Sequence, residues 1–181
     1  LSECIARERE YKKIGEIKAA TGNSAVEALA GKVLFYFLMY TAYSLFFFAV
    51  IFSVFKINLL GSVPALILTT SLMILSSIFL AIFVSSFFKR KFVALIITAF
   101  TSYPLFFISG YVFPSYALPV PLQYFSKIFA VTPYLKAFGR ITQSGAGFGN
   151  VSGEIISLSV ITLALFAFAW FRIKYLFSRE P

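Results

Sequence analysis

Four long apolar runs divide the chain, and polar or charged residues separate them. The runs cover residues 33–55, 64–88, 92–113 and 151–171, and Glu154 in the first turn of the last is their one charged residue. A helix needs about 20 residues to cross the hydrocarbon of a bilayer. Lipid tolerates only helices or closed barrels, because every backbone polar group must be paired. The pattern predicts an all-α membrane protein with four transmembrane helices.

The composition supports this interpretation and narrows the chemistry. Hydrophobic residues make up 60% of the 181 residues and charged residues 13%, against roughly 45–50% and 25% in soluble domains. The chain has no His, and all seven acidic residues are Glu. Triads that use His, metal sites with His ligands and Asp dyads are therefore excluded. The single cysteine, Cys4, excludes an internal disulfide.

The basic residues predict how the spans are oriented. Twelve of the 16 fall on one side of the predicted spans: Arg7, Arg9, Lys12, Lys13, Lys18, Lys32, Lys89, Arg90, Lys91, Arg172, Lys174 and Arg179. The other four are Lys56, Lys127, Lys136 and Arg140. By the positive-inside rule both termini are cytoplasmic. The net charge of +9 then reflects membrane topology, and we expect no nucleic acid partner.

Residues 1–32 are polar and predict a cytoplasmic segment. Ile14 and Ile17 recur at helical spacing, and Thr21-Gly22-Asn23 is typical of a turn. Ser24 and Glu27 form a capping box, so a second helix is expected to start there and run into the first span. Two interpretations remain open. The segment lies on anionic lipid, or it is a docking element for a cytoplasmic partner.

The segment from Pro114 to Asn150 is too long for a plain connection, at 37 residues, and too apolar for a solvated loop. Its prolines divide it, and we expect two short helices at about 120–131 and 133–143, with Thr132 capping the second. Apolar stretches of this length favour re-entrant helices over a full span. The alternative is an amphipathic pair in the outer headgroups.

Within the spans the sequence offers few reactive groups. No span interior carries an ionisable residue apart from tyrosines, so coupling to an ion gradient is not expected and any energy source lies elsewhere. Ser77, Ala81 and Ser85 recur every four residues and predict a close-packed helix face. Thr98, Thr101, Ser102 and Tyr103 cluster before Pro104. They form either a hinge in a pathway wall or a kink whose freed carbonyls these hydroxyls satisfy.

Two blocks of the sequence resemble permeases of the type-2 ATP-binding-cassette (ABC) exporter family. The first block is Ile5-Ala-Arg-Glu-Arg-Glu10, Gly15-Glu16 and the run from Ser24 to Gly31-Lys32. The second is Ile108-Ser-Gly-Tyr-Val-Phe-Pro114, Leu118-Pro119, Leu122-Gln-Tyr-Phe-Ser126, Thr132-Pro-Tyr134 and Arg140. Their order relative to the spans matches the family across nearly the whole chain.

The resemblance implies the last four spans of a six-span permease that forms a homo- or heterodimer on two ATPase subunits. It implies no cofactor in this chain, with ATP and magnesium on the partner subunit, and a bacterial inner-membrane location. Residues about 8–20 match the coupling helix, which assigns ATPase docking to Glu8, Arg9, Glu10, Lys12, Lys13, Gly15 and Glu16. The third span lines the path, with Thr98, Thr101, Ser102, Ser109, Gly110, Tyr111 and Val112 as its candidates. Residues 120–143 form the re-entrant pair that closes the outside.

The sequence therefore predicts a permease, not an enzyme, whose substrate path is driven by ATP hydrolysis on another chain. The uncharged, aromatic spans favour an amphipathic or apolar substrate. The alternative is a membrane scaffold or assembly factor that recruits a cytoplasmic partner without transport. An ion channel is a third possibility, weakened by the lack of a charge ring along the spans.

Overall fold

The computed structural model describes residues 6, 10–11, 25–56, 59–110 and 118–179. Within these residues every regular element is a helix. The elements are α3 (Ala25–Val54), α4 (Val63–Ser85), α5 (Lys91–Ile108), α6 (Val120–Ser126), α7 (Val131–Ser144), the 3-10 helix η2 (Phe148–Val151) and α8 (Ser152–Arg179). Four of them, α3, α4, α5 and α8, are long and apolar enough to cross a membrane. The prediction of four membrane-spanning helices is confirmed.

The helix ends differ from the predicted ones in two places. α3 begins at Ala25, in agreement with the helix start expected at Ser24, whereas α8 continues past residue 171 to Arg179. The predicted end of the third span at residue 113 is wrong, because α5 stops at Ile108. Gly110 has φ +88°, a left-handed conformation that a right-handed helix cannot contain.

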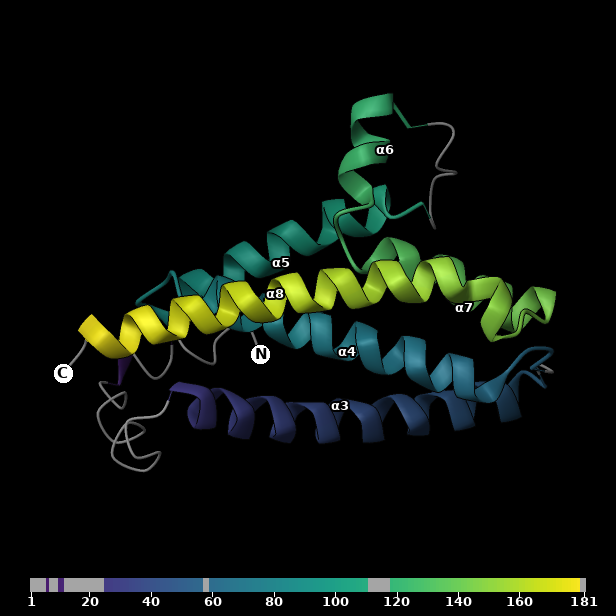
Figure 1. Ribbon diagram of the computed structural model, residues 1–181, viewed down its shortest axis with the longest axis horizontal. Coiled ribbons are helices and arrows are strands. Elements are labelled where there is room, and N and C mark those ends of the chain that lie inside the picture. Colours follow the sequence, from purple (N-terminus) through teal and green to yellow (C-terminus); the bar gives the residue numbers. More distant parts are fainter. Residues whose placement is uncertain (1–5, 7–9, 12–24, 57–58, 111–117, 180–181) are drawn as a thin grey trace.

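The α4 helix is the centre of the bundle and contacts α3, α5, α7 and α8. It runs parallel to α8, and α3 runs antiparallel to both (Figure 1). Phe79 of α4 lies edge-on to Phe166 of α8 with their ring centroids 5.3 Å apart. Thr162 of α8 donates through Oγ1 to the Leu72 carbonyl at 3.4 Å. These contacts, which keep nearly the same register along both helices, join α4 and α8 into the main packing unit.

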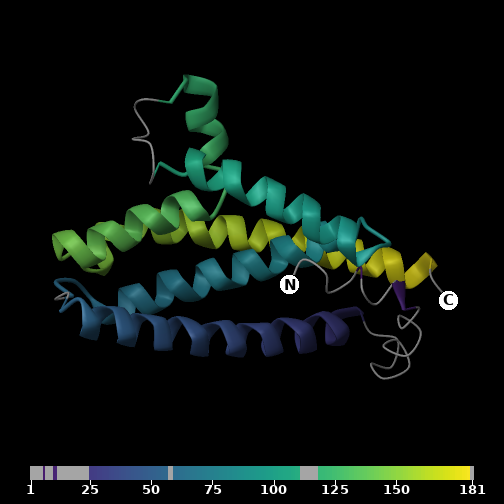
Figure 2. The same cartoon turned by 180° about the vertical axis from the view of Figure 1, so that it is seen from behind.

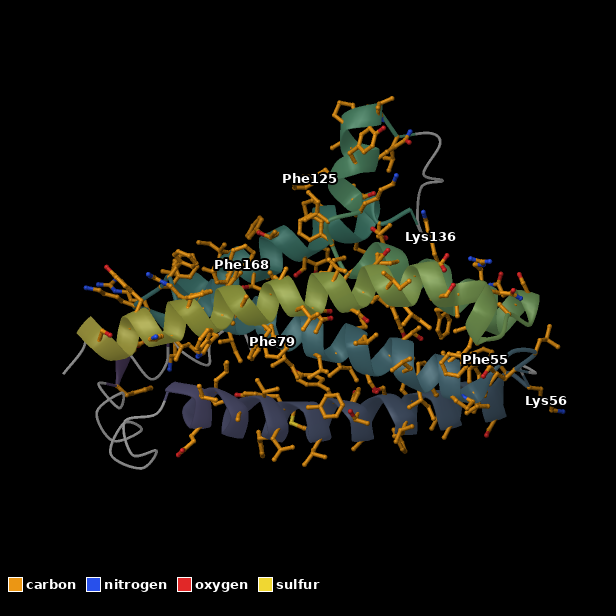
Figure 3. All side chains as sticks on the ribbon, viewed as in Figure 1. Phe55, Lys56, Phe79, Phe125, Lys136 and Phe168 are labelled. Carbon is orange, nitrogen blue, oxygen red and sulfur yellow. The ribbon has the colours of Figure 1, made fainter. Side chains whose placement is uncertain are left out.

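Two apolar clusters fill the bundle. One joins α3, α4 and α8 and consists of Leu29, Ile78, Phe79, Ile82, Ala169, Ile173 and Leu176. The other joins α4 to α7 and the following loop and consists of Ala65, Leu66, Ile141, Ala146 and Val151. Figure 3 shows Phe79 in the interior of the bundle, and this side chain is 7% exposed. The first cluster lies toward the end where α4 and α8 finish, and the second lies where they begin.

The basic residues mark two ends of the bundle. We call the end where α3 and α5 begin and α4 and α8 finish the basic end, and the opposite one the α7 end (Figures 1 and 2). The basic end carries Lys32, Lys89, Arg90, Lys91, Arg172 and Lys174 among the described residues. Lys56, Lys127, Lys136 and Arg140 belong to the α3–α4 connection, the α6–α7 joint and α7. The two groups thus separate along the bundle as the sequence predicts.

The two short helices exist, although their bounds and packing differ from the prediction. α6 ends at Ser126, and α7 begins at Val131, ahead of Thr132. The predicted cap is wrong, since Thr132 Oγ1 donates to the Ser126 carbonyl at 2.7 Å and fastens α7 to α6. α7 lies alongside α4 and α8, whereas α6 contacts α5 and projects away from the bundle (Figure 2).

At the α7 end two backbone turns fit against each other. A Cβ atom at Gly61 would overlap the Ile141 carbonyl oxygen and would lie 2.8 Å from the Ala146 carbonyl oxygen. The amide of Ser62 donates to the same Ala146 oxygen at 3.4 Å. Only a residue without a side chain leaves room for this approach. The α3–α4 turn therefore holds the end of α7 through backbone contacts.

We expect Gly61→Ala to lower the free energy of unfolding by about 1–3 kcal/mol, because rigid backbone must shift to admit the methyl group. Gly147→Ala is the matched control, since a Cβ there has nothing within 4 Å. Thermal unfolding in detergent measures both. Equal stability of the two variants would contradict the close packing of these turns.

Candidate functional site

The hydroxyl groups of Thr98, Thr101 and Ser102 on α5 are satisfied within their own helix. Thr98 Oγ1 donates to the Ala94 carbonyl at 2.8 Å, Thr101 Oγ1 to Ile97 at 2.8 Å and Ser102 Oγ to Thr98 at 2.7 Å. Each bond joins a residue to the carbonyl four positions earlier. A hydroxyl paired in this way can face lipid, protein or water without a further partner.

These hydroxyls lie on one side of α5. At 100° per residue, Thr98, Ser102 and Ser109 follow one stripe with Thr101 beside it, and this stripe includes Ala94, which is fully buried. The opposite side carries Ile96, Phe100 and Tyr103, and the last two are 76% and 72% exposed. Of the predicted pathway residues, the structure thus brings Thr98, Thr101, Ser102 and Ser109 together on the side that the chain covers at the basic end.

That side is uncovered farther along the helix. Ala94 is buried and Thr98 is half-buried, but Thr101 and Ser102 are exposed. In Figure 1, α5 moves away from α8 as it rises from the basic end. A polar stripe therefore faces space that this chain alone leaves open, bounded on one side by apolar helices.

Pro104 interrupts α5 without help from these hydroxyls. Proline has no amide to pair with the carbonyl four residues earlier, which belongs to Phe100. The three hydroxyl bonds go to Ala94, Ile97 and Thr98 instead. Of the two interpretations of this cluster, satisfaction of the freed carbonyl by the hydroxyls is wrong.

The end of α5 that lies away from the basic end is a tight turn. Ser109 is 3% exposed and its Oγ donates to the Phe106 carbonyl at 2.6 Å, while Gly110 takes the left-handed conformation described above. Ser109 and Gly110 are therefore at the end of the hydroxyl stripe, close to where α6 contacts α5. Tyr111 and Val112 lie outside the described residues.

At the basic end, the described part of the predicted docking segment contacts the α4–α5 connection. The buried Ala6 amide donates to Ser85 Oγ at 2.9 Å, and the Glu10 carboxylate accepts from the Lys91 amide at 2.9 Å. Lys91 Nζ donates to Tyr11 Oη at 3.1 Å. Of the predicted docking residues, Glu8, Arg9, Lys12, Lys13, Gly15 and Glu16 lie outside the described residues.

Arg172 is a packing element at this end that was not predicted from the sequence. Its guanidinium carbon lies 4.5 Å from the centre of the Phe87 ring and 5.4 Å from that of Tyr175. One terminal nitrogen donates to the Ser86 carbonyl at 3.5 Å, and Nε is buried with no hydrogen-bond partner in the described part of the chain. The signal was a lone arginine among aromatic residues just after an apolar run. Arg172 joins α8 to the α4–α5 connection.

The α7 end has one ion pair within the described residues. Arg140 of α7 donates to the Glu154 carboxylate of α8 at 2.8 Å, with 48% and 17% of the two side chains exposed. It pairs the single acidic residue of the apolar runs with a cation from a neighbouring helix. The charge of Glu154 is thereby compensated where α8 begins.

A family model described as ABC-2 family transporter protein matches residues 1–171. No curated protein and no solved structure matches the chain significantly. The family model spans the four transmembrane helices, the hydroxyl stripe of α5, the two short helices and the N-terminal segment. This chain belongs to the ABC-2 transporter family and is a membrane permease component of an ABC transporter.

Proposed function

We propose that this chain forms the substrate path of an ABC exporter and is driven by ATP hydrolysis on a separate subunit. The observation that carries the proposal is the family match over residues 1–171, joined to spans that hold no carboxylate or His at mid-membrane depth. An ion-coupled transporter places such groups near the midplane. ATP and magnesium would be held by the partner, and the chain itself would have no cofactor and no catalytic role.

The partner ATPase would dock on the N-terminal segment at the basic end. Of the seven docking residues that the family resemblance implies, which include Glu10, the proposed contacts are Glu8, Arg9, Lys12, Lys13, Gly15 and Glu16. The segment belongs to the end of the bundle that carries most of the basic residues. Both termini would then be cytoplasmic, in a bacterial inner membrane, by the positive-inside rule.

The substrate would move along the hydroxyl stripe of α5. Thr101 and Ser102 are exposed on a single chain, and a path needs a second wall. A second permease half, identical or related, would supply that wall, and lipid would cover the remaining apolar faces. Phe35, Phe46 and Phe92 belong to these faces and are 64%, 69% and 70% exposed. Walls of this composition suit an amphipathic or apolar substrate.

The two short helices would close the outer side as a re-entrant pair. The packing of α7 supports this interpretation, because Phe138 stacks on Phe48 of α3 at 6.0 Å and Ile141 joins the cluster around Ala65 and Leu66. With these contacts α7 lies alongside the membrane helices and not across their ends (Figure 1). Backbone at this depth is tolerated because protein buries it.

The docking proposal is tested by purifying the full-length protein in mild detergent and identifying any ATPase that accompanies it. We expect a nucleotide-binding subunit to accompany the wild type and to be lost with Glu8→Lys or Glu16→Lys. The reversed charge would repel the group on the ATPase that the glutamate contacts. Lys136→Glu is the control, because the Lys136 side chain is exposed on α7, and this variant should retain the subunit. A cytoplasmic protein without nucleotide-binding activity in its place would favour the scaffold alternative.

The path proposal is tested by water accessibility on a Cys4→Ser background. We expect cysteines at Thr98, Thr101 and Ser102 to react with a membrane-impermeant thiol reagent, and cysteines at Ile96 and Phe100 to remain protected by lipid. The labelling rate at Thr101 should change when vanadate traps the ATPase. Equal labelling on both sides of α5 would contradict the assignment of the path.

A further inference from the structure

Glu10 makes a contact that docking does not explain. Its carboxylate accepts a hydrogen bond from the backbone amide of Lys91, 81 positions later in the chain, at 2.9 Å. Lys91 is the first residue of α5, and the first amides of a helix have no partner within it. The positive end of the helix dipole also favours a carboxylate there. Glu10 therefore caps α5 from another segment.

The sequence of α5 lacks a cap of its own. Arg90 occupies the N-cap position and makes no side-chain capping hydrogen bond, and the first turn holds no acidic residue. The start of the helix instead carries the positive charges of Lys89, Arg90 and Lys91. The helix dipole disfavours positive charge at this end. The carboxylate of Glu10 supplies what the local sequence does not.

Two further contacts bind the same short segment to the α4–α5 connection. The Ala6 amide donates to Ser85 Oγ on the α4 side, and both residues are fully buried. Lys91 Nζ bonds Tyr11 Oη on the α5 side and lies 5.2 Å from the centre of the Tyr11 ring. The segment thus holds the end of α4 and the start of α5 together.

The two sides of this connection are held unequally by the rest of the chain. α4 is packed on α8 along the whole bundle, and Arg172 adds a contact with Phe87 and Ser86. α5 contacts α4 and α6, and its apolar side is exposed. A displacement of Ala6, Glu10 and Tyr11 would therefore move the start of α5 more easily than the α4–α8 unit.

We propose that Glu10 is a positioning residue which transmits movement of the docking segment to α5, and not a contact with the ATPase. This inference rests on the proposed function. The carboxylate is engaged by α5, and α5 carries the hydroxyl stripe. The helix that Glu10 caps is thus the helix that carries the proposed substrate path. The start of α5 is bound to the segment on which the ATPase would act.

The experiment compares Glu10→Ala, Glu10→Gln and the wild type in the complex with its ATPase, with Thr101→Cys as reporter on the Cys4→Ser background. The readout is the ratio of labelling rates at this cysteine between the nucleotide-free and the vanadate-trapped complex. We expect a change of roughly fivefold or more in the wild type. Glu10→Ala should bring the ratio close to one while the ATPase stays bound. Glu10→Gln keeps an acceptor oxygen and should give an intermediate ratio.

Glu27→Gln is the matched control, because it removes an acidic charge from the first turn of α3, and its ratio should equal that of the wild type. Should Glu10→Ala fail to fold, the comparison of Glu10→Gln with Glu27→Gln decides. Loss of the ATPase from both Glu10 variants, as expected for Glu8→Lys, would overturn the inference and make Glu10 a docking residue. An unchanged ratio in Glu10→Ala would also overturn it. A wild type that captures no ATPase overturns the proposed function, and this inference with it.

Discussion

Lipid leaves no backbone amide or carbonyl without a partner, and the architecture of this chain follows from that constraint. The spans are helices because a helix pairs its own amides and carbonyls. The hydroxyls of Thr98, Thr101 and Ser102 obey the same rule by bonding carbonyls one turn earlier. A polar stripe can therefore exist on α5 without a fixed partner, as the proposed substrate path requires.

The constraint relaxes at the basic end, where charges and water are available, and there the helices are connected differently. α4 and α8 are joined by apolar packing along their length, whereas α5 is held at its start by polar contacts from residues before α3. Polar contacts near water exchange more readily than a buried apolar interface. The helix with the hydroxyl stripe is thus the one whose start can move.

The apolar runs alone predicted the four spans, because crossing a bilayer demands a length and composition that few other structures share. Local sequence did not predict where α5 ends, since that depends on the left-handed conformation of Gly110. It also misjudged the packed face of α4: Ser85 is buried, but Ser77 is exposed and Ile78 and Ile82 are buried in its place. Which face packs depends on the neighbours of α4. The contact of Glu10 with Lys91 joins segments 81 positions apart, and the periodicity of the sequence cannot predict such a distant contact.

We infer that α5 moves with the N-terminal segment while α4 and α8 remain one unit. Electron cryomicroscopy of the full transporter with its ATPase, without nucleotide and after vanadate trapping, measures this movement directly. We expect the start of α5 to shift together with Ala6, Glu10 and Tyr11, and Phe79 to keep its contact with Phe166. Separation of α4 from α8 around a stationary α5 would contradict this inference.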